Sequence, residues 1–355
     1  MSSTPSTTDP SAPDRDIAAM IRQIISEHAS SGHPQTGHLD RELWNTLTSA
    51  GLTRITGAPQ RGGSGAGWPE AAALIQECAR HGALVPVVEH DLLAGWLLDE
   101  MAAPGDDVTR TLAILDASGA ADDVAWAGGT ERVVLLWPVG DSWLLADVAT
   151  ADLEVTATPA LSEAPCGHVR AELATLSGRP VATRLLEELC LRTTLARSLQ
   201  ISAALEAALD SAVRHTTQRV QFGRPIARFQ AVQNLVADMA VETGLARVAA
   251  TAALVEVVRA GFDADASRFA IAAAASCVGH ASSTVVRNAH QAHGAMGTTR
   301  EHDLHLVTRP VLRWRNDPFP VRHWDRALAE LTVTQGPDGL WPLVTDGLAP
   351  RLPTA

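Results

Sequence analysis

The chain has 355 residues, a formal net charge of −12, 46% hydrophobic residues and 19% charged residues. This composition is ordinary for a globular protein, and the length suffices for two or three domains. The negative charge disfavours nucleic acid and anionic membranes as partners. All 28 cationic residues are arginines and tyrosine is absent, which excludes a lysine Schiff base, a Walker lysine and a Tyr–Lys reductase pair.

The hydrophobic runs and the cysteine spacing indicate the cellular compartment in which the protein is expected. No run approaches the roughly 20 apolar residues of a membrane span, and the N-terminus does not resemble a signal peptide, so we expect a cytoplasmic protein. The four cysteines form no C-x-x-C pair and are expected to be free thiols packed in the core.

The first part of the chain reads as helical. Residues 1–15 are rich in Ser, Thr, Pro and Asp and are predicted to be a disordered tail. Apolar residues at helical spacing predict an N-terminal helical domain over residues 16–108. The glycine-rich stretch 60–67 follows no strand, which favours a flexible loop over a phosphate cradle. We expect His90 and Asp91 to be surface or capping groups.

The hydrophobic period changes between residues 109 and 178. Short runs typical of β-strands occur at 133–137, 143–148 and 153–157, divided by Gly, Asp and Pro. They predict a small, reduced β domain over 109–178.

Helical patterning returns over residues 179–334. Long apolar-faced segments, rich in alanine, suit close antiparallel packing and predict a C-terminal four-helix bundle. The expected helices span 181–215, 230–260, 264–290 and a final segment near 321–331. Residues 335–355 contain several Pro and Gly and are predicted to be an irregular tail. The fold class is therefore α+β, mostly α.

A possible ligand motif lies between two of these helices. Arg219, Gln221, Phe222 and Gly223 place a cation, an amide, an aromatic ring and a glycine within five residues. A guanidinium can fork onto phosphate oxygens, a ring can stack, and glycine allows close approach of the backbone. On these residues alone, an ordinary corner between two helices, with Phe222 in the core, is the preferred interpretation.

A second motif follows the third long helix. Here Gly294 and Gly297 supply a turn without side chains, and Gln291 and His293 stand beside it. Taken together, the two motifs resemble the acyl-CoA dehydrogenase family of flavoproteins, which carries R-x-x-F-G-x-x-I-x-x-x-Q and Q-x-x-G-G-x-G-x-x-x-E. The matching residues are Arg219, Phe222, Gly223, Ile226, Gln230, Gln291, Gly294, Gly297 and Glu301, while Ala295 replaces one glycine.

The resemblance implies FAD as cofactor, an acyl-CoA thioester as substrate and α,β-dehydrogenation as reaction, but two features of the family are missing. The small stretch 115–123 stands where the family has a T-E-P-x-x-G-S-D-like loop against the flavin ring. The family's usual glutamate base aligns with Pro318, and the alternative base position aligns with Val220. Asp317 is a weak candidate for a displaced base, although Asn-Asp-Pro is primarily a turn sequence.

What remains is the part that, in the family's dimers, contacts the FAD of the neighbouring subunit. The sequence therefore resembles a degenerate β-type subunit, paired with a catalytic acyl-CoA dehydrogenase-type subunit in a heterodimer or heterotetramer. The predicted contacts to the FAD pyrophosphate and adenosine are Arg219, Gln221, Phe222, Gly223, Gln291, His293, Gly294 and Gly297. No metal site is predicted.

Two alternatives remain open. One is a self-sufficient homomeric dehydrogenase or oxidase with a non-standard base, and the other is a flavin-free structural subunit. The acyl group is not defined, so fatty acids, branched acids and sterol side chains all stay possible.

Overall fold

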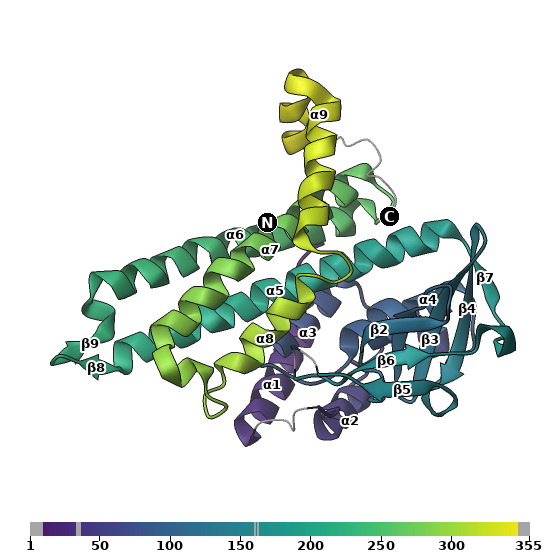
Figure 1. Ribbon diagram of the computed structural model, residues 1–355, viewed down its shortest axis with the longest axis horizontal. Helices are drawn as coiled ribbons and strands as arrows, with labels where there is room; N and C mark the ends of the chain where they lie inside the picture. Colours follow the sequence, from purple (N-terminus) through teal and green to yellow (C-terminus); the bar gives the residue numbers. More distant parts are fainter. Residues whose placement is uncertain (1–9, 33–36, 160, 162, 347–355) are drawn as a thin grey trace, which may run out of the picture.

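The computed structural model describes residues 10–32, 37–159, 161 and 163–346. Helices at the N-terminus, a β region in the middle and long helices at the C-terminus follow one another along the chain (Figure 1). The predicted fold class, α+β and mostly helical, is confirmed.

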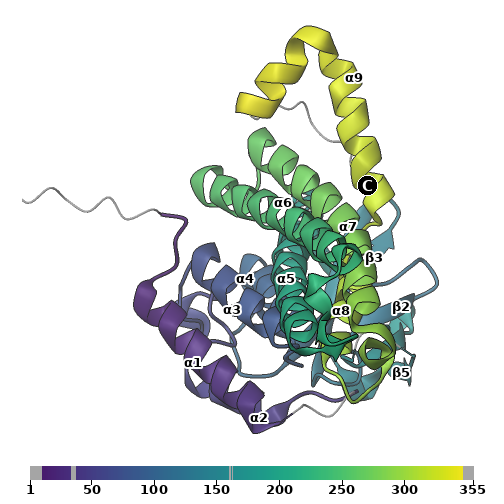
Figure 2. The same cartoon turned by 90° about the vertical axis from the view of Figure 1, so that its left-hand side faces the viewer.

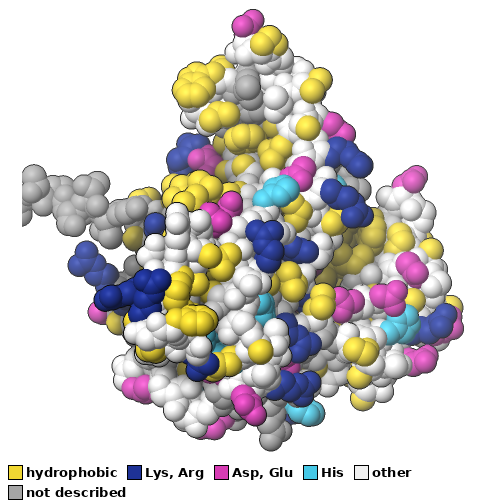
Figure 3. All heavy atoms as spheres, turned by 60° about the vertical axis from the view of Figure 1, so that its left-hand side comes forward, with side chains coloured by type: hydrophobic (Ala, Val, Ile, Leu, Met, Phe, Trp, Pro, Cys, Tyr) yellow, Lys and Arg dark blue, Asp and Glu magenta, His cyan; other side chains and the backbone are white. Residues whose placement is uncertain are grey.

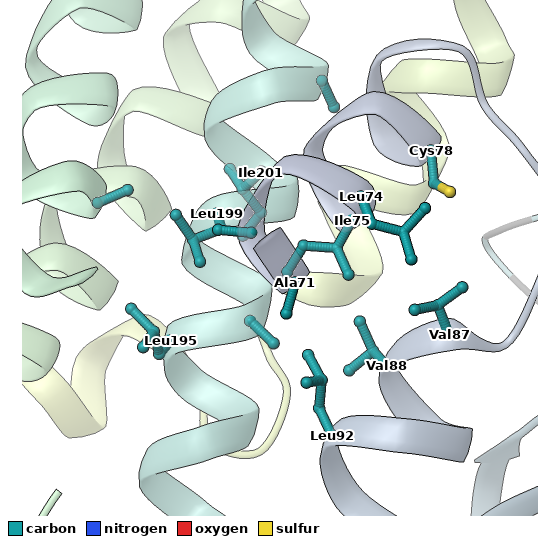
Figure 4. Packing of buried hydrophobic residues seen from close by; sticks show 14 of the residues in the cluster. Ala71, Leu74, Ile75, Cys78, Val87, Val88, Leu92, Leu195, Leu199 and Ile201 are labelled. Atoms are coloured by element: carbon teal, nitrogen blue, oxygen red, sulfur yellow. The ribbon is translucent and has the colours of Figure 1, made fainter. Parts of the chain in front are cut away.

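The N-terminal region is made of short helices. They are α1 (Arg15–Ser31), α2 (Arg41–Ser49), α3 (Trp68–Arg80), the π-helical segment η2 (Val88–Gly95) and α4 (Trp96–Glu100). The apolar face of α3 packs against residues of η2 and of the longest helix, α5 (Thr183–Gln218), in a buried layer (Figure 4).

Only residues 10–15 of the predicted N-terminal tail are described. Helix α1 begins at Arg15 because the Asp14 carboxylate accepts hydrogen bonds from the N–H groups of Asp16 and Ile17. Residues 1–9, the rest of the predicted tail, lie outside the described residues.

Two sheets form the β region. The first has the order β1-β3-β4-β7 and the second the order β2-β6-β5. The strands are β1 (Arg110–Ile114), β2 (Ala120–Ala125), β3 (Arg132–Val139), β4 (Ser142–Ala149), β5 (Glu154–Ala157), β6 (Cys166–Arg170) and β7 (Arg179–Val181). Strand β3 is buried on both faces: Val133 and Leu135 face the core between the sheets, whereas Val134 and Leu136 join the helical core.

Three long antiparallel helices make the C-terminal region. They are α5 (Thr183–Gln218), α6 (Gln230–Ala260) and α7 (Asp265–His293), followed by the shorter α8 (Leu304–Trp314) and by α9 (Val321–Asp346). Small residues such as Ala204, Ala246 and Ala274 are fully buried where these helices meet. Among the described residues, α7 is the one helix that is long and apolar enough to cross a membrane, by length and composition alone, but 56% of its most apolar stretch is buried inside the protein.

The predicted four-helix bundle needs a correction. The fourth helix on α5 is α8, which was not predicted because it is short and contains Pro310. The helix expected there, α9, places Trp324 against Ala272 and Ala275 of α7 and then rises away from the bundle (Figure 2).

The predicted irregular tail, 335–355, is also wrong where the chain is described. Helix continues to Asp346 after a kink at Gly336, whose φ is 69°. The kink places Pro337 at the start of the second helical piece, where a proline needs no hydrogen-bond donor. Residues 347–355 lie outside the described residues.

Candidate functional site

The first motif forms a β-hairpin at the end of the bundle. Strand β8 (Val220–Gln221) pairs with β9 (Arg224–Pro225), and Phe222 and Gly223 form the two-residue turn with φ values of 53° and 78°. The Phe222 side chain is 92% exposed, and its ring has only the edge-on ring of Phe229 nearby, at 6.0 Å. An exposed aromatic residue in the left-handed region is uncommon and points to a function outside the chain's own core.

Arginines surround this hairpin without acidic partners. Among the described residues, no carboxylate pairs with Arg219, Arg224 or Arg228. Arg224 lies over the ring of Phe229 at 4.3 Å, and the N-terminus of the 31-residue helix α6 begins beside it. In an acidic protein, unpaired guanidinium groups next to a helix N-terminus are suited to a phosphate-bearing ligand. Exposed arginines lie among apolar side chains on this side of the molecule (Figure 3).

The second motif ends α7 and leads into the short helical turn η6 (Gly294–Thr298). Gln291 is exposed in the last turn of α7, and Gly294, with a φ of 62°, follows the end of the helix. A Cβ atom on Gly223 or Gly294 would meet nothing within 4 Å, so both backbones are open to a ligand. Gly297 differs, because a Cβ there would come within 2.7 Å of His293 Cβ; its role is packing.

The structure brings the two motifs together. The ring of His215, in the last turn of α5, stacks on that of His293 with centroids 4.6 Å apart. Arg219 ends α5 one turn later, so the hairpin and the Gln291 turn occupy the same end of the bundle (Figure 1). Six predicted residues face outward there: Arg219, Gln221, Phe222, Gly223, Gln291 and Gly294. His293 is instead buried, 4% exposed.

A second feature lies between the three regions of the chain. It is a cavity of about 50 Å³, lined by the segment after α3, by η2, α5 and α8, and by Trp126. Typical ligand pockets are several times larger, about 300–1,000 Å³. The bulky indole groups of Trp126 and Trp314 are among the side chains that line the cavity.

The polar groups at this cavity satisfy one another. Arg197 of α5 donates to Glu89 Oε1 at 2.6 Å, to Gln200 Oε1 at 2.8 Å and to Asp317 Oδ2 at 2.8 Å. Burial lowers the pKa of Arg197, but the two carboxylates outweigh burial and hold this pKa above its usual range. The guanidinium therefore stays charged, and it links the N-terminal helices to the loop after α8.

The sequence had suggested that His90 and Asp91 are surface or capping groups, but both side chains are buried because η2 is enclosed on all sides. Hydrophobic periodicity cannot reveal such burial in so short a π-helical segment. Asp91 Oδ2 accepts from Thr56 N and Thr56 Oγ1, both at 2.9 Å. His90 Nδ1 accepts from Arg110 N at 3.1 Å. The two residues connect η2 to a neighbouring loop and to β1.

Comparison with known proteins identifies the family. The acyl-CoA dehydrogenase N-terminal domain matches residues 11–104, and the acyl-CoA dehydrogenase C-terminal domain matches residues 187–315. These two matches come from one family, in its order, and span more than half of the chain. The chain belongs to the acyl-CoA dehydrogenase family.

Similar proteins include an acyl-CoA dehydrogenase and chains from solved structures. Acyl-CoA dehydrogenase FadE34 of Mycobacterium tuberculosis is 30% identical over 292 residues, which is 76% of this chain but only 39% of FadE34. The crystal structure of the ChsE4-ChsE5 complex from Mycobacterium tuberculosis contains a chain with a TM-score of 0.76 and 21% identity, covering 94% of this chain and 99% of that one. The Tcur3481-Tcur3483 steroid acyl-CoA dehydrogenase G363A variant also has a TM-score of 0.76 and 21% identity, covering 89% and 96%.

Acyl-CoA dehydrogenases generally use FAD, and the two regions of this chain fit that cofactor differently. The open hairpin with its unpaired arginines fits the phosphate-bearing end. The cavity, at about 50 Å³, is too small for the flavin ring. In the separate stretch 115–123, the Asp116 carboxylate holds the β1–β2 turn by accepting from Ser118 N at 2.8 Å. Twenty-two residues of α5 separate Arg197 from Arg219, about 33 Å at about 1.5 Å per residue, so the two regions are not one compact site.

The structure also places the candidate bases. Pro318, at the family's usual position, follows Asp317 in the loop after α8, whereas Val220 lies on the distant hairpin. Asp317 does not line the cavity, and its carboxylate is held by Arg197. The one carboxylate among the cavity-lining residues, Glu89, is paired with the same guanidinium.

Proposed function

We propose that this chain is the subunit without a catalytic base in a heteromeric acyl-CoA dehydrogenase. The observation that carries the proposal is the contrast between two regions of α5. The end of the helix at Arg219 keeps an open surface with cations that no described carboxylate pairs, whereas the region around Arg197, near the middle of the helix, borders a cavity of only about 50 Å³ whose one carboxylate is paired.

In this assembly the hairpin contacts FAD that is seated in the partner. Arg219 pairs with the pyrophosphate, Phe222 packs on the adenosine side, and Gln291 and the Gly294 backbone contact the same portion. Bound FAD supplies the acceptor for the hydride that leaves the β carbon of the acyl group. The partner supplies the carboxylate that removes the α proton.

The partner is an acyl-CoA dehydrogenase-type subunit with an intact base. Support comes from the similar structures, one described as a complex of ChsE4 and ChsE5 and the other named by two chains and as a steroid enzyme. The outer face of α6 supports it as well, because it carries a row of exposed apolar residues at helical spacing. These are Val241, Leu245, Val248 and Val255. A steroid-derived acyl-CoA is the substrate class that we favour for the complex.

The decisive experiment is a flavin assay on the purified chain alone and on its complex with a partner. Partner candidates are acyl-CoA dehydrogenase-type chains that carry the glutamate base, co-expressed with this chain. We expect a colourless chain and a yellow complex with about one FAD per pair. A chain that binds one FAD per subunit by itself would overturn the proposal and favour the homomeric alternative. A stable complex without flavin would overturn it in favour of a structural subunit.

Arg219→Ala tests the contact itself. Loss of a charge-assisted hydrogen bond costs about 1.5–3 kcal/mol, so FAD should dissociate from the complex roughly 10- to 100-fold more readily. Arg170→Ala, at an exposed arginine of β6, is the matched control and should retain FAD as the wild type does.

A further inference from the structure

Three histidines from three separate elements meet beneath the hairpin. His215 comes from the last turn of α5, His293 ends α7, and His302 precedes α8. One ring nitrogen from each lies within 4.8 Å of the others, and this is the one group of metal-ligating side chains found among the described residues. Three imidazole rings therefore lie close together where three helix ends meet.

The hydrogen bonds of His293 orient it as a ligand. Its Nδ1 lies 2.7 Å from the carbonyl oxygen of Ala289, which can only accept, so Nδ1 carries the proton. The lone pair is therefore on Nε2, which faces the Ser211 hydroxyl at 3.2 Å. A backbone carbonyl that fixes the tautomer from behind is the usual second contact of a metal-binding histidine.

The cluster can also be reached from solvent. His215 and His302 are only half-buried, so an ion can approach from their side.

We propose that His215, His293 and His302 form a binding site for a divalent transition-metal ion, with Zn²⁺ as the ion that fits best. Three imidazoles and one further oxygen make a familiar tetrahedral set, and the Ser211 hydroxyl or a water takes the fourth position. Zn–N bonds of about 2.0–2.1 Å place tetrahedral nitrogens about 3.4 Å apart. The distances between the ring nitrogens must therefore shrink by roughly 1 Å, a movement that half-buried side chains can make.

Two groups oppose binding, and both provide diagnostics. His302 Nδ1 accepts from Leu304 N at 3.1 Å, so coordination requires this ring to turn and to release an N–H in the first turn of α8. Arg219 follows His215 by one helical turn at the end of α5, and its positive charge disfavours a second cation nearby. Zinc binding should therefore expose the Leu304 amide to faster hydrogen exchange, and Arg219→Gln should tighten binding.

The site has a structural consequence. A zinc ion there would join the ends of α5 and α7 to the start of α8, immediately below the hairpin. The proposal concerns this chain alone and needs no FAD, so it stands or falls independently of the proposed function.

The test is a Co²⁺ titration of the tag-free, chelator-treated chain, followed by Zn²⁺ competition. Cobalt in a tetrahedral site gives visible d–d bands, so we expect one Co²⁺ per chain, displaced by Zn²⁺. His215→Gln and His302→Gln should each weaken binding by more than the roughly 10–100-fold that loss of a second contact costs. His280→Gln, at an exposed histidine paired with Asp325, is the control and should bind as the wild type does.

Circular dichroism melting shows that each variant is folded, and His302→Gln, at a half-buried ring, is the variant least able to disturb the core. Absence of tetrahedral Co²⁺ bands in the wild type would overturn the proposal. So would equal affinity in wild type, His302→Gln and His280→Gln. Slower or unchanged exchange of the Leu304 amide on Zn²⁺ addition would also contradict it.

Discussion

Arg197 Nε and Asp317 Oδ2 lie 2.8 Å apart although 120 residues separate them in the chain. The same guanidinium holds Glu89, so one arginine links a buried turn of the N-terminal helices, the central helix and the loop where relatives place their base. Arg197→Met should leave Glu89 buried and unpaired, which typically costs about 3–5 kcal/mol. Urea unfolding measures this, and Glu89→Gln combined with Arg197→Met should recover part of the loss.

Asp317→Asn separates a structural role from a catalytic one. The Asp317 side chain is 35% exposed, so its contact with Arg197 contributes less than the Glu89 contact, about 1 kcal/mol or less. We expect the dehydrogenase activity of the complex to be kept. Activity reduced a thousandfold at unchanged FAD content would instead identify Asp317 as the base.

Asp91 gives the chain a defined pH dependence. Burial raises its pKa to about 6, above the value of 3.8 for a free carboxyl. The folded state then holds the Asp91 proton more tightly than the unfolded state does. The contribution of this proton to the free energy of unfolding is therefore complete below about pH 3.8 and is lost as pH rises through 6. Asp91→Asn should therefore gain stability relative to the wild type between pH 4 and 7.5, by roughly 3 kcal/mol or less. Urea midpoints at a series of pH values show this trend.

His90 affects the pH dependence of stability in the opposite direction to Asp91. Burial and Arg54 lower its pKa to about 3, so its contribution is present above pH 6.5 and is lost as pH falls toward 3. His90→Asn can keep an acceptor near Arg110 N and should remove this acid sensitivity. If wild type and His90→Asn lose stability in parallel below pH 6, the histidine is not a source of acid unfolding.

The exposed ring of Phe222 allows its effect on FAD binding to be separated from its effect on stability. Because it is 92% exposed, Phe222→Ala should leave the melting temperature of the isolated chain within experimental error. The complex should lose FAD more readily, measured as flavin released on gel filtration. Equal flavin retention in wild type and variant would remove Phe222 from the proposed contact.

The apolar face of α6 predicts where the partner binds. Leu245, 54% exposed, can be replaced by Glu without loss of stability in the isolated chain. The same change should prevent co-purification with the partner. Val139→Glu, at an exposed valine of β3, serves as the control. Loss of the complex in both variants would show a general solubility effect and not a defined interface.

Long helices were predictable from the sequence because their apolar period extends over many turns. Helix α6 spans Gln230–Ala260 as the pattern predicted. Short elements were not predictable. Strands β2 and β6 contain Asp, Gly and His, and α8 contains Pro310, so local propensity hides them until tertiary contacts form.

The motifs of the candidate site could be predicted from the sequence, but the directions in which their residues face could not. Exposure of Phe222 and inward packing of Gly297 both depend on backbone geometry that a motif does not encode. The histidine cluster was missed because its members come from positions 215, 293 and 302, and no short spacing connects them. A metal-ligand pattern is visible in sequence only when ligands lie within a few residues of each other.

Helix α5 is one uninterrupted 36-residue rod with its two chemically distinct regions at separate points along it. Because about 33 Å of helix separates Arg197 from Arg219, substitutions around the cavity need not alter the surface of the hairpin. Smaller residues in place of Trp126 or Trp314 could therefore enlarge the cavity while the hairpin keeps its backbone and its exposed arginines.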